Sequence, residues 1–533
     1  MDALVAVLGS SDHATGDLGS MLDAHWPESE RHDARYEAAG IALAATRTAA
    51  GGAVVGLPRV HQIGSVRAVQ RFDWPSLAGP APVPWFEDGA SPSPATPTTI
   101  AWDEATRTLI VARDPMGESP LWYAAQPGRL AVATYPGALR ALPWVSDAPD
   151  PLGWPAFEAR IPLLAGETRW RDLRRLPPGH LLVARDGRIE IHAWWALEPT
   201  RLEALPNDAG WFERIRLALE RSVARRIPAA GAVGTQLSGG LDSSAVALLA
   251  ARALAPPGRA LHTFSHVPAV RWNPPQPGDE TPYVEAVLGC MPNAIPHFAT
   301  GESGPPGPAH GEALHGHDRE VRDAAHDAGM LTVLSGWGGD EGVSYNGDGF
   351  FAGQLLRGRL WWVLRWCHRF GGGTLLQTAR IFYGKVICQQ LGSLAPTPGS
   401  QTRRRPVVRE LLRSLPIETQ RVLLERSVNH RRLRKAASAR ENQRRLLNNS
   451  HIGGRIDLDA EWSIPAGFAF RYPLLDPELL GLVLAAPERL CTVGGRTRTL
   501  LRHSLMGIYP ELIQRRHGKF ISHPQRPAFV SLA

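Results

Sequence analysis

Residues 232–254 read AVGTQLSGGLDSSAVALLAARAL, and this stretch decides the fold. Residues 232–237 are mostly apolar and predict a strand, whereas the alanine- and leucine-rich residues 243–254 predict a helix. The loop 238–243 places glycines at a helix N-terminus, where backbone N–H groups can approach a phosphate closely. The stretch therefore predicts a parallel α/β sheet with a phosphate-binding loop at the carboxyl end of one strand.

The acidic residue of this loop predicts a metal ion. Asp242 would repel phosphate groups by itself, so we expect a magnesium ion to bridge its carboxylate and the phosphates. Ser238 and Ser243 are expected to donate hydroxyl hydrogen bonds. The loop lacks the Gly-Lys-Ser ending of a Walker A motif, which argues against kinase-type cleavage of ATP. The alternative is a glycine-rich turn with a serine cap on the helix.

A second glycine-rich segment, LSGWGGDEG at 334–342, follows a predicted strand over 331–334. A further strand is predicted over 261–264, and His266 just beyond it either lines the nucleotide pocket or is an ordinary loop histidine. Carboxyl ends of parallel strands meet at one edge of a sheet, so Asp242 and Asp340 are expected to share a magnesium ion. A surface acidic pair is the alternative.

The surrounding chain divides into two parts. Short apolar runs between glycines and prolines predict a β-rich domain over 1–205, in which residues 1–9 form a buried first strand rather than a signal peptide. Helical patterns alternate with short apolar runs over 206–533, so the fold class is α/β with two domains and a boundary near 199–206. Residues 79–97 are rich in proline and serine and predict an exposed loop.

Composition narrows the function classes. The chain has 533 residues, 44% of them hydrophobic, and no apolar run long enough to span a bilayer. Its four cysteines are scattered in a way that matches neither a zinc ribbon nor a disulfide framework. We therefore expect a soluble cytoplasmic protein with no membrane insertion.

Basic and aromatic residues gather in a region, 347–453, whose pattern is helical. The net charge is +7, and the arginines concentrated over 403–445 form either a solvated helical face or a surface for a polyanion. Trp361, Trp362 and Trp366 are expected to pack in a core. An amphipathic surface helix is the alternative.

The two loops resemble the ATP-pyrophosphatase signature and the Ser-Gly-x-Gly-x-Asp-Glu segment of the asparagine synthetase and β-lactam synthetase family. Segments 113–123 and 176–180 resemble its amidotransferase domain, and segments 471–476 and 498–502 resemble its synthetase domain. The resemblance implies a class II glutamine-amidotransferase-like, Ntn-type domain over 1–205 and an ATP-pyrophosphatase (adenine nucleotide alpha hydrolase-like) domain over 206–533. It also implies an acyl-adenylate made from ATP with Mg²⁺, with AMP and pyrophosphate released. The residues expected at the nucleotide are Leu237, Ser238, Gly239, Gly240, Asp242, Ser243, His266, Ser335 and Gly336, with Asp242 and Asp340 on the metal.

Departures from the family pattern narrow the reaction. Glutamine-hydrolysing members expose a cysteine at position 2, but this chain has Asp2 and no cysteine before Cys290, and its glutamine-binding segments are missing. Trp337 stands where asparagine synthetases usually carry glutamate. Members without a glutamine site include β-lactam synthetases and lasso-peptide macrolactam synthetases, and the chain looks most like the latter.

That branch implies a precursor peptide as substrate, whose Asp or Glu side chain is adenylated and then attacked by the peptide's N-terminal amine. The Trp- and Arg-rich stretch 354–445 would grip the peptide. A leader-peptide-binding protein and a leader protease are the expected partners, and nucleic acid is not. The alternative is an asparagine synthetase-like enzyme that uses ammonia to convert aspartate to asparagine.

The C-terminal segment RRHGKF, at 515–520, resembles the family's Arg-x-Lys segment. Its lysine would stabilise charge in the adenylation and amide-forming steps. Counting back from Phe520 favours His517 at that position, whereas residue chemistry favours Lys519, which carries a charge near pH 7. We predict Lys519 as the catalytic residue beside Asp242 and Asp340.

Two rivals belong to other classes. A tRNA-modifying ATP pyrophosphatase would also suit the basic charge and the first loop, but the cysteines are too scattered for the zinc-binding pairs that many such enzymes carry. A non-enzymatic scaffold has little reason to keep Ser238, Asp242 and Asp340 together.

Overall fold

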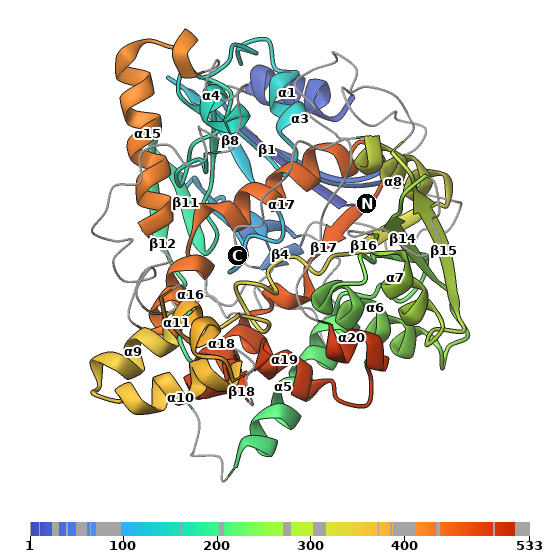
Figure 1. Cartoon of the computed structure of the whole chain (residues 1–533). Helices are drawn as coiled ribbons and strands as arrows, with labels where there is room; N and C mark the ends of the chain where they lie inside the picture. Colours follow the sequence, from blue (N-terminus) through green and yellow to red (C-terminus); the bar gives the residue numbers. More distant parts are fainter. Residues whose placement is uncertain are drawn as a thin grey trace.

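The computed structural model describes most of the chain (Figure 1). The described residues are 2–9, 11–23, 31–38, 41–48, 61–63, 66–70, 98–159, 161–201, 207–269, 279–301, 316–370, 373–383, 386, 412–432, 438–493 and 496–516. The predicted loop 79–97, the boundary residues 202–206, and both His517 and Lys519 lie outside them.

The N-terminal part contains two six-stranded antiparallel sheets. In spatial order the first has β10 (Leu173–Arg175), β8 (Trp122–Gln126), β9 (Arg129–Ala133), β1 (Asp2–Leu8), β3 (Ile41–Thr48) and β2 (Arg31–Ala38). The second has β12 (Arg188–Ala193), β11 (His180–Arg185), β7 (Thr108–Ala112), β6 (Thr99–Asp103), β5 (Val66–Gln70) and β4 (His61–Ile63).

Strand β1 is apolar from Ala3 to Leu8 because it is covered on both faces. Leu4 and Ala6 belong to the core shared with the second sheet, whereas Val5 and Val7 belong to a core on the opposite face with helix α1 (Ser11–Asp23). Successive side chains of a strand point to opposite faces, so a strand covered on both sides is apolar throughout. The prediction of a buried first strand is confirmed.

The C-terminal part is built on a five-stranded parallel sheet. Its order is β15 (Ala294–Ala299), β14 (Leu261–His266), β13 (Ala232–Gln236), β16 (Met330–Leu334) and β17 (Ala469–Arg471). The three strands predicted from sequence are therefore confirmed. From β13 the chain continues to β14 and β15 on one side, whereas β16 and β17 lie on the other, so the sheet has its topological switch point between β13 and β16.

The remaining elements are helices and short strands. They are α3 (Pro136–Arg140), α4 (Gly153–Glu158), α5 (Asp208–Arg225), α6 (Leu241–Leu254), α7 (Thr281–Leu288), α8 (Gly316–Asp327), α9 (Phe350–Leu356), α10 (Leu360–Phe370), α11 (Leu375–Phe382), α15 (Ile417–Arg432), α16 (Ala439–Leu447), α17 (Ser450–Ser463), η3 (Pro473–Leu475), α18 (Pro477–Ala485), η4 (Glu488–Cys491), β18 (Thr492–Val493), β19 (Arg496–Thr497), α19 (Thr499–Ser504) and α20 (Glu511–Arg515). Within the described residues, no helix combines the length and apolar character needed to cross a bilayer.

Helices α15 and α17 pack on the N-terminal part, although in sequence they lie between strands β16 and β17 of the parallel sheet (Figure 1). Ala460 of α17 belongs to the same core as β1, and Leu423 of α15 packs with Ile161. The buried Asp457 of α17 also forms ion pairs with Arg113 and Arg175. Helix α17 therefore ties the N-terminal part to the strand and loops that follow it.

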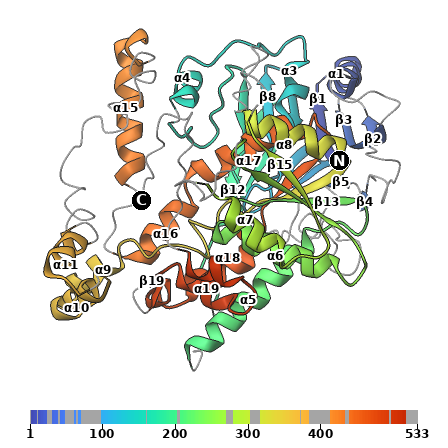
Figure 2. The same cartoon turned by 45° about the vertical axis from the view of Figure 1, so that its right-hand side comes forward.

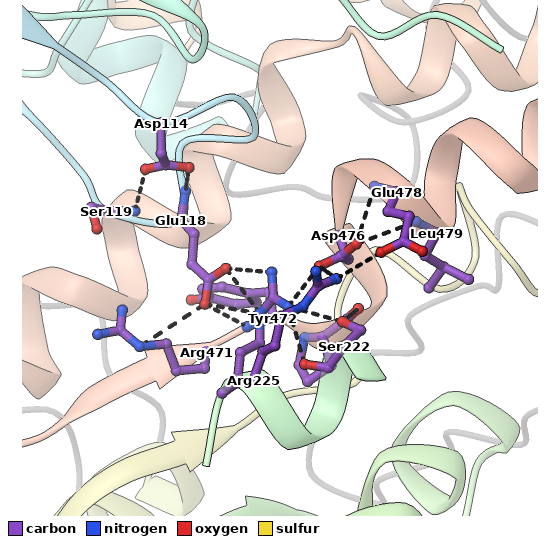
Figure 3. Close-up of polar contacts among 12 residues, drawn as sticks. Asp114, Glu118, Ser119, Ser222, Arg225, Arg471, Tyr472, Asp476, Glu478 and Leu479 are labelled. Carbon is purple, nitrogen blue, oxygen red and sulfur yellow. Dashed lines mark hydrogen bonds and ion pairs between the residues drawn. The ribbon is translucent and has the colours of Figure 1, made fainter. Parts of the chain in front are cut away.

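The segments that resemble family signatures at 113–123 and 471–476 meet in a buried ion-pair network (Figure 3). Arg226 forms ion pairs with Glu118 at 2.8 Å and with Asp476 at 3.0 Å, and all three side chains are almost fully buried. Burial by itself would lower the pKa of Arg226, but the two carboxylates outweigh it and raise that pKa. Charged residues of these segments thus join the two parts of the chain.

The prediction that the tryptophans at 361–366 pack in a core is wrong for two of the three. Trp361 is 82% exposed and Trp362 is 45% exposed, whereas Trp366 packs on Phe351 with ring centroids 3.8 Å apart. The buried positions of α10 are Val363 and Cys367, which lie one helical turn apart. Helix α10 is therefore the amphipathic surface helix that was the alternative interpretation.

Candidate active site

The first glycine-rich loop joins β13 to α6 at the carboxyl edge of the parallel sheet. Gly239 has φ +66°, and a Cβ atom there would lie 2.6 Å from the Cβ of Tyr283, so both conformation and space require glycine. The Oγ atom of Ser243 accepts a hydrogen bond from the N–H of Ser238 and lies 3.0 Å from the Ser238 hydroxyl. Both predicted serines therefore face each other across the loop.

The second glycine-rich loop packs directly on the first turn of α6. A Cβ atom on Gly336 would lie 2.7 Å from the backbone nitrogen of Ser243, and one on Gly339 would lie 2.3 Å from Oδ1 of Asp242. The Ser335 hydroxyl donates to the side-chain carbonyl of Gln236, at 2.8 Å, which ties the loop to the end of β13. The two motifs thus form one continuous surface, because neighbouring strands β13 and β16 end there.

Two carboxylates of these loops converge on one guanidinium group. Nη1 of Arg498 lies 2.5 Å from Oδ1 of Asp340 and 3.6 Å from Oδ2 of Asp242. Burial by itself would lower the pKa of Arg498, but Asp340 and Asp242 outweigh it and raise the pKa. Arg498 also has φ +59°, a left-handed conformation that is costly for a side chain bearing a Cβ and is held here by the surrounding contacts.

The donor set fits a magnesium ion. Carboxylate oxygens are the ligands that Mg²⁺ prefers, and it usually takes one or two of them from the protein, with phosphate oxygens and water completing the octahedron. Asp242 and Asp340 supply two carboxylates at one place. The described residues contain no cluster of three or more His, Cys, Asp or Glu side chains that could hold a metal by themselves. The arrangement therefore suits a metal that arrives with a phosphate ligand.

Trp337 and two residues that the sequence reasoning did not single out form the next layer of the site. The ring of His451 lies edge-on to that of Trp337, with centroids 6.2 Å apart, and its Nε2 atom lies 3.0 Å from the buried carboxylate of Glu341. Asn449, the N-cap of α17, bonds both the backbone and Nδ1 of His451. Asn449 before a helical pattern was the only local signal for this cluster.

Arg516 contacts the phosphate-binding loop, and sequence reasoning did not predict these contacts. Its Nη1 atom donates to the carbonyl oxygen of Gly239 at 2.6 Å, its guanidinium lies 4.0 Å from the ring centroid of Tyr283, and it forms an ion pair with Glu280. Arg502 donates to the carbonyl of Arg516 and fixes the backbone there. Arg516, the last residue that the structure describes, therefore lies directly beside the phosphate-binding loop.

The other predicted residues fall at the same edge of the sheet or outside the described residues. Leu237 is buried and donates its N–H to the carbonyl of Phe264, whereas His266 is exposed at the carboxyl end of β14. Gly240 is the N-cap of α6. Lys519 and its alternative His517 are not described, so the assignment of Lys519 stays a prediction.

We expect Arg516→Gln to raise the dissociation constant for ATP roughly 10- to 100-fold, because a charge-assisted hydrogen bond contributes about 1.5–3 kcal/mol. Titration with ATP measures the effect. Arg515→Gln is the matched control, since Arg515 is 70% exposed and pairs only with the exposed Glu511 among the contacts described. If the two variants bound ATP with equal affinity, Arg516 would not contribute to ATP binding by supporting the loop.

Comparison with known families agrees with this geometry. The sequence model described as asparagine synthase matches residues 214–294 and 319–526, more than half of the chain. The chain belongs to the asparagine synthase family. A second model, the glutamine amidotransferase domain, matches residues 98–195. The N-terminal sheets therefore form a glutamine-amidotransferase-like, Ntn-type domain, and the parallel sheet is the asparagine-synthase domain, as the sequence resemblance implied.

Relatives within the asparagine synthase family match only part of their length. A putative glutamine-hydrolysing asparagine synthetase of Mycobacterium tuberculosis is 35% identical over 158 residues, which are 28% of this chain and 24% of that protein. Asparagine synthetase 3 of Bacillus subtilis is 26% identical over 213 residues, covering 38% and 34%. The carboxyethyl-arginine β-lactam-synthase of Streptomyces clavuligerus is 32% identical over 147 residues, covering 27% and 26%. The chain thus spans about a quarter to a third of these relatives.

One solved structure with a related description is the glutamine phosphoribosylpyrophosphate amidotransferase of Bacillus subtilis. It is 11% identical, with a TM-score of 0.24, and the match covers 62% of this chain and 90% of that one.

Proposed function

We propose that this chain is an ATP-dependent amide ligase that activates a carboxylate as an acyl-adenylate. The observation that carries the proposal is the convergence of Asp242 and Asp340 on Arg498, where two glycine-rich loops meet at the switch point of the sheet. Ligands of open parallel sheets bind at such switch points. When bound, magnesium would neutralise charge on the pyrophosphate as it leaves.

We assign residues of the chain to two roles, binding of the ATP phosphates and stabilisation of charge during the reaction. We propose that the N–H groups at the start of α6 and the hydroxyls of Ser238 and Ser243 bind phosphate oxygens, which the position of both serines at this helix N-terminus supports. Arg498 carries a positive charge at the same place, which favours binding of the polyanion. Lys519 follows Arg516 by three residues in the sequence. We propose that Lys519 stabilises the negative charge on AMP as it departs.

The acceptor we propose is the amine of a peptide, whose own Asp or Glu side chain has been adenylated. Ammonia from glutamine is not expected, because Asp2 stands where glutamine-hydrolysing members have cysteine. Trp337 places an apolar ring, rather than a carboxylate, next to the ATP-binding segment. Both reacting groups on one bound peptide make amide formation intramolecular, which removes several kcal/mol from the barrier when the geometry is good.

A cavity of about 530 Å³ beside this layer has room for a peptide segment. It lies between the N-terminal part and the turn from α16 to α17, and is lined by Leu164, Ala165, Glu441, Arg444, Arg445, Asn448, Asn449 and Ser450. Asn449 continues from the cavity wall to His451 and thence to Trp337. The two arginines of the cavity pair with glutamates, Arg444 with Glu198 and Arg445 with Glu441, and we propose that an acidic group of the peptide replaces such a partner. Of the stretch 354–445, it is therefore the end near Arg444 that we assign to the substrate.

The test mixes the full chain with Mg-ATP and a candidate precursor peptide whose side-chain carboxylate carries heavy oxygen. We expect a peptide product lighter by one water, stoichiometric AMP and pyrophosphate, and one labelled oxygen in the AMP. That labelled oxygen can reach AMP only if the carboxylate attacked the α-phosphate. Formation of ADP and phosphate would refute the adenylation step. Release of glutamate from added glutamine would refute the prediction that the chain does not hydrolyse glutamine.

An asparagine synthetase-like reaction that uses ammonia is the second candidate, favoured by the names of several relatives. It shares the adenylation step and differs only in the acceptor. Efficient formation of asparagine from aspartate and ammonia, with no loss of water from any peptide, would replace the macrolactam proposal while leaving the ATP site unchanged.

A further inference from the structure

Helices α10 and α11 lie at the edge of the molecule (Figure 2). Both helices expose large apolar side chains. Trp361 is 82% exposed on α10, and Leu375 and Leu376 are 84% and 83% exposed on α11. We call these residues and their exposed neighbours the helical surface; the neighbours are Leu356, Leu360, Trp362 and Tyr383. Apolar residues grouped in this way on a protein surface mark an interaction site.

The most exposed residues of the helical surface are not needed to hold the two helices in place. Their inner faces already pack on the body of the protein through Val363 and Cys367, which are fully buried, and through Trp366 against Phe351. The Oγ1 atom of Thr378 on α11 lies 3.1 Å from Nδ1 of His368 on α10. The ring of Trp362 also packs against those of Phe350 and Phe351, whereas Trp361, Leu375 and Leu376 are each more than 80% exposed. Within the described residues, these three side chains are therefore available to a partner.

The stretch of sequence that contains the helical surface carries charges of one sign. Between Asp348 and Glu410 the sequence has no acidic residue, but it has nine arginines and one lysine. Five of these arginines are exposed beside the apolar residues: Arg357, Arg359, Arg365, Arg369 and Arg380. Trp361 precedes Arg365 by four residues and Leu376 precedes Arg380 by four, so each pair shares one outward helix face. A partner of the helical surface is therefore both anionic and able to take up apolar side chains.

An anionic lipid bilayer combines these two properties. Helices α10 and α11 lie at the lower left margin of the molecule in Figure 2. The cavity that we assign to the substrate lies elsewhere, beside α16. Helices with arginines next to tryptophan and leucine lie in the plane of a membrane, where the ring and aliphatic groups reach the headgroup boundary and arginines bind lipid phosphates.

We propose that the helical surface docks the protein on the surface of an anionic membrane, without crossing it. Lipid phosphates would bind the five exposed arginines, while Trp361, Leu375 and Leu376 enter the headgroup region. An acidic peptide is less suited to this surface, because its binding would leave outward apolar residues on both helices uncovered.

The experiment measures sedimentation of the full chain with phosphatidylcholine vesicles and with vesicles that also contain roughly one third phosphatidylglycerol. We expect binding to the second kind only, released as salt shortens the range of electrostatic attraction. Arg365→Gln with Arg380→Gln should lower the partition coefficient roughly 25-fold, about fivefold per charge. Trp361→Ser with Leu376→Ser should lower it more than about tenfold.

The control changes an exposed basic residue and an exposed apolar residue on β12, Arg188→Gln with Ile191→Ser. This variant should bind vesicles as the natural chain does. Equal binding to both vesicle types, binding to neither, or an equal loss in the control would overturn the proposal. So would concentration-dependent self-association that disappears in the Trp361→Ser, Leu376→Ser variant without any lipid preference, because the surface would then belong to a second copy of the chain.

Discussion

Asp242→Asn and Asp340→Asn are each expected to lower the rate of AMP formation by roughly 1,000-fold or more. Either change removes a negative charge from the pair that would hold magnesium, and such electrostatic stabilisation supplies several kcal/mol of a barrier. Quantifying pyrophosphate release at saturating ATP and substrate measures the effect. A variant that retained the natural rate would show that its residue lies outside the reaction.

Folding controls separate this effect from damage to the structure. The Asp340 side chain is 49% exposed, so loss of its ion pair with Arg498 in Asp340→Asn should change the free energy of unfolding by at most about 1 kcal/mol. The Asp242 side chain is buried beside Gly339, so its variant needs a direct check of unfolding. Asp323→Asn, on the exposed surface of α8, is the matched control and should leave the rate unchanged.

Glu118→Gln is expected to lower the free energy of unfolding by about 3–5 kcal/mol. The change removes one of the two carboxylates that hold the buried guanidinium of Arg226, and an uncompensated buried charge is costly. Urea unfolding monitored by tryptophan fluorescence measures the loss. Glu478→Gln is the control, since the Glu478 side chain is 44% exposed and its pairs with Arg221 and Arg225 contribute at most about 1 kcal/mol. Equal effects would contradict a special role for the buried network.

The same network makes stability depend on pH. Burial by itself would raise the pKa of Asp476, but Arg226 and Arg225 outweigh it and lower the pKa. The carboxylate's contribution is therefore fully present above the ordinary aspartate pKa, about 3.9, and is lost as pH falls through the lower folded value. Acid unfolding of the natural chain should begin below about pH 4 and shift upward in Asp476→Asn.

Long-range contacts explain which residues the sequence did not reveal. Glu118 and Arg226 are 108 positions apart in the sequence, and Arg113 and Asp457 are 344 apart. No local sequence pattern can therefore predict either ion pair. The same holds for Arg516, whose partner Gly239 lies 277 positions away. The prediction that the tryptophans of α10 pack in a core was wrong for another reason. Composition alone does not tell which face of a helix is covered, and here Val363 and Cys367 are the buried residues.

By itself the sequence determined the strands and helix around the two glycine-rich loops, the parallel sheet and the two carboxylates at its edge. Those features follow from short-range physics: glycine at positive φ, a helix N-terminus after a strand, and strand ends that meet at one edge. Only the tertiary structure decided that Arg498 lies between Asp242 and Asp340, and that Arg516 holds the loop. It also decided that α17 packs on the N-terminal sheets. These contacts join residues far apart in the chain, and their energy depends on burial that exists only after folding.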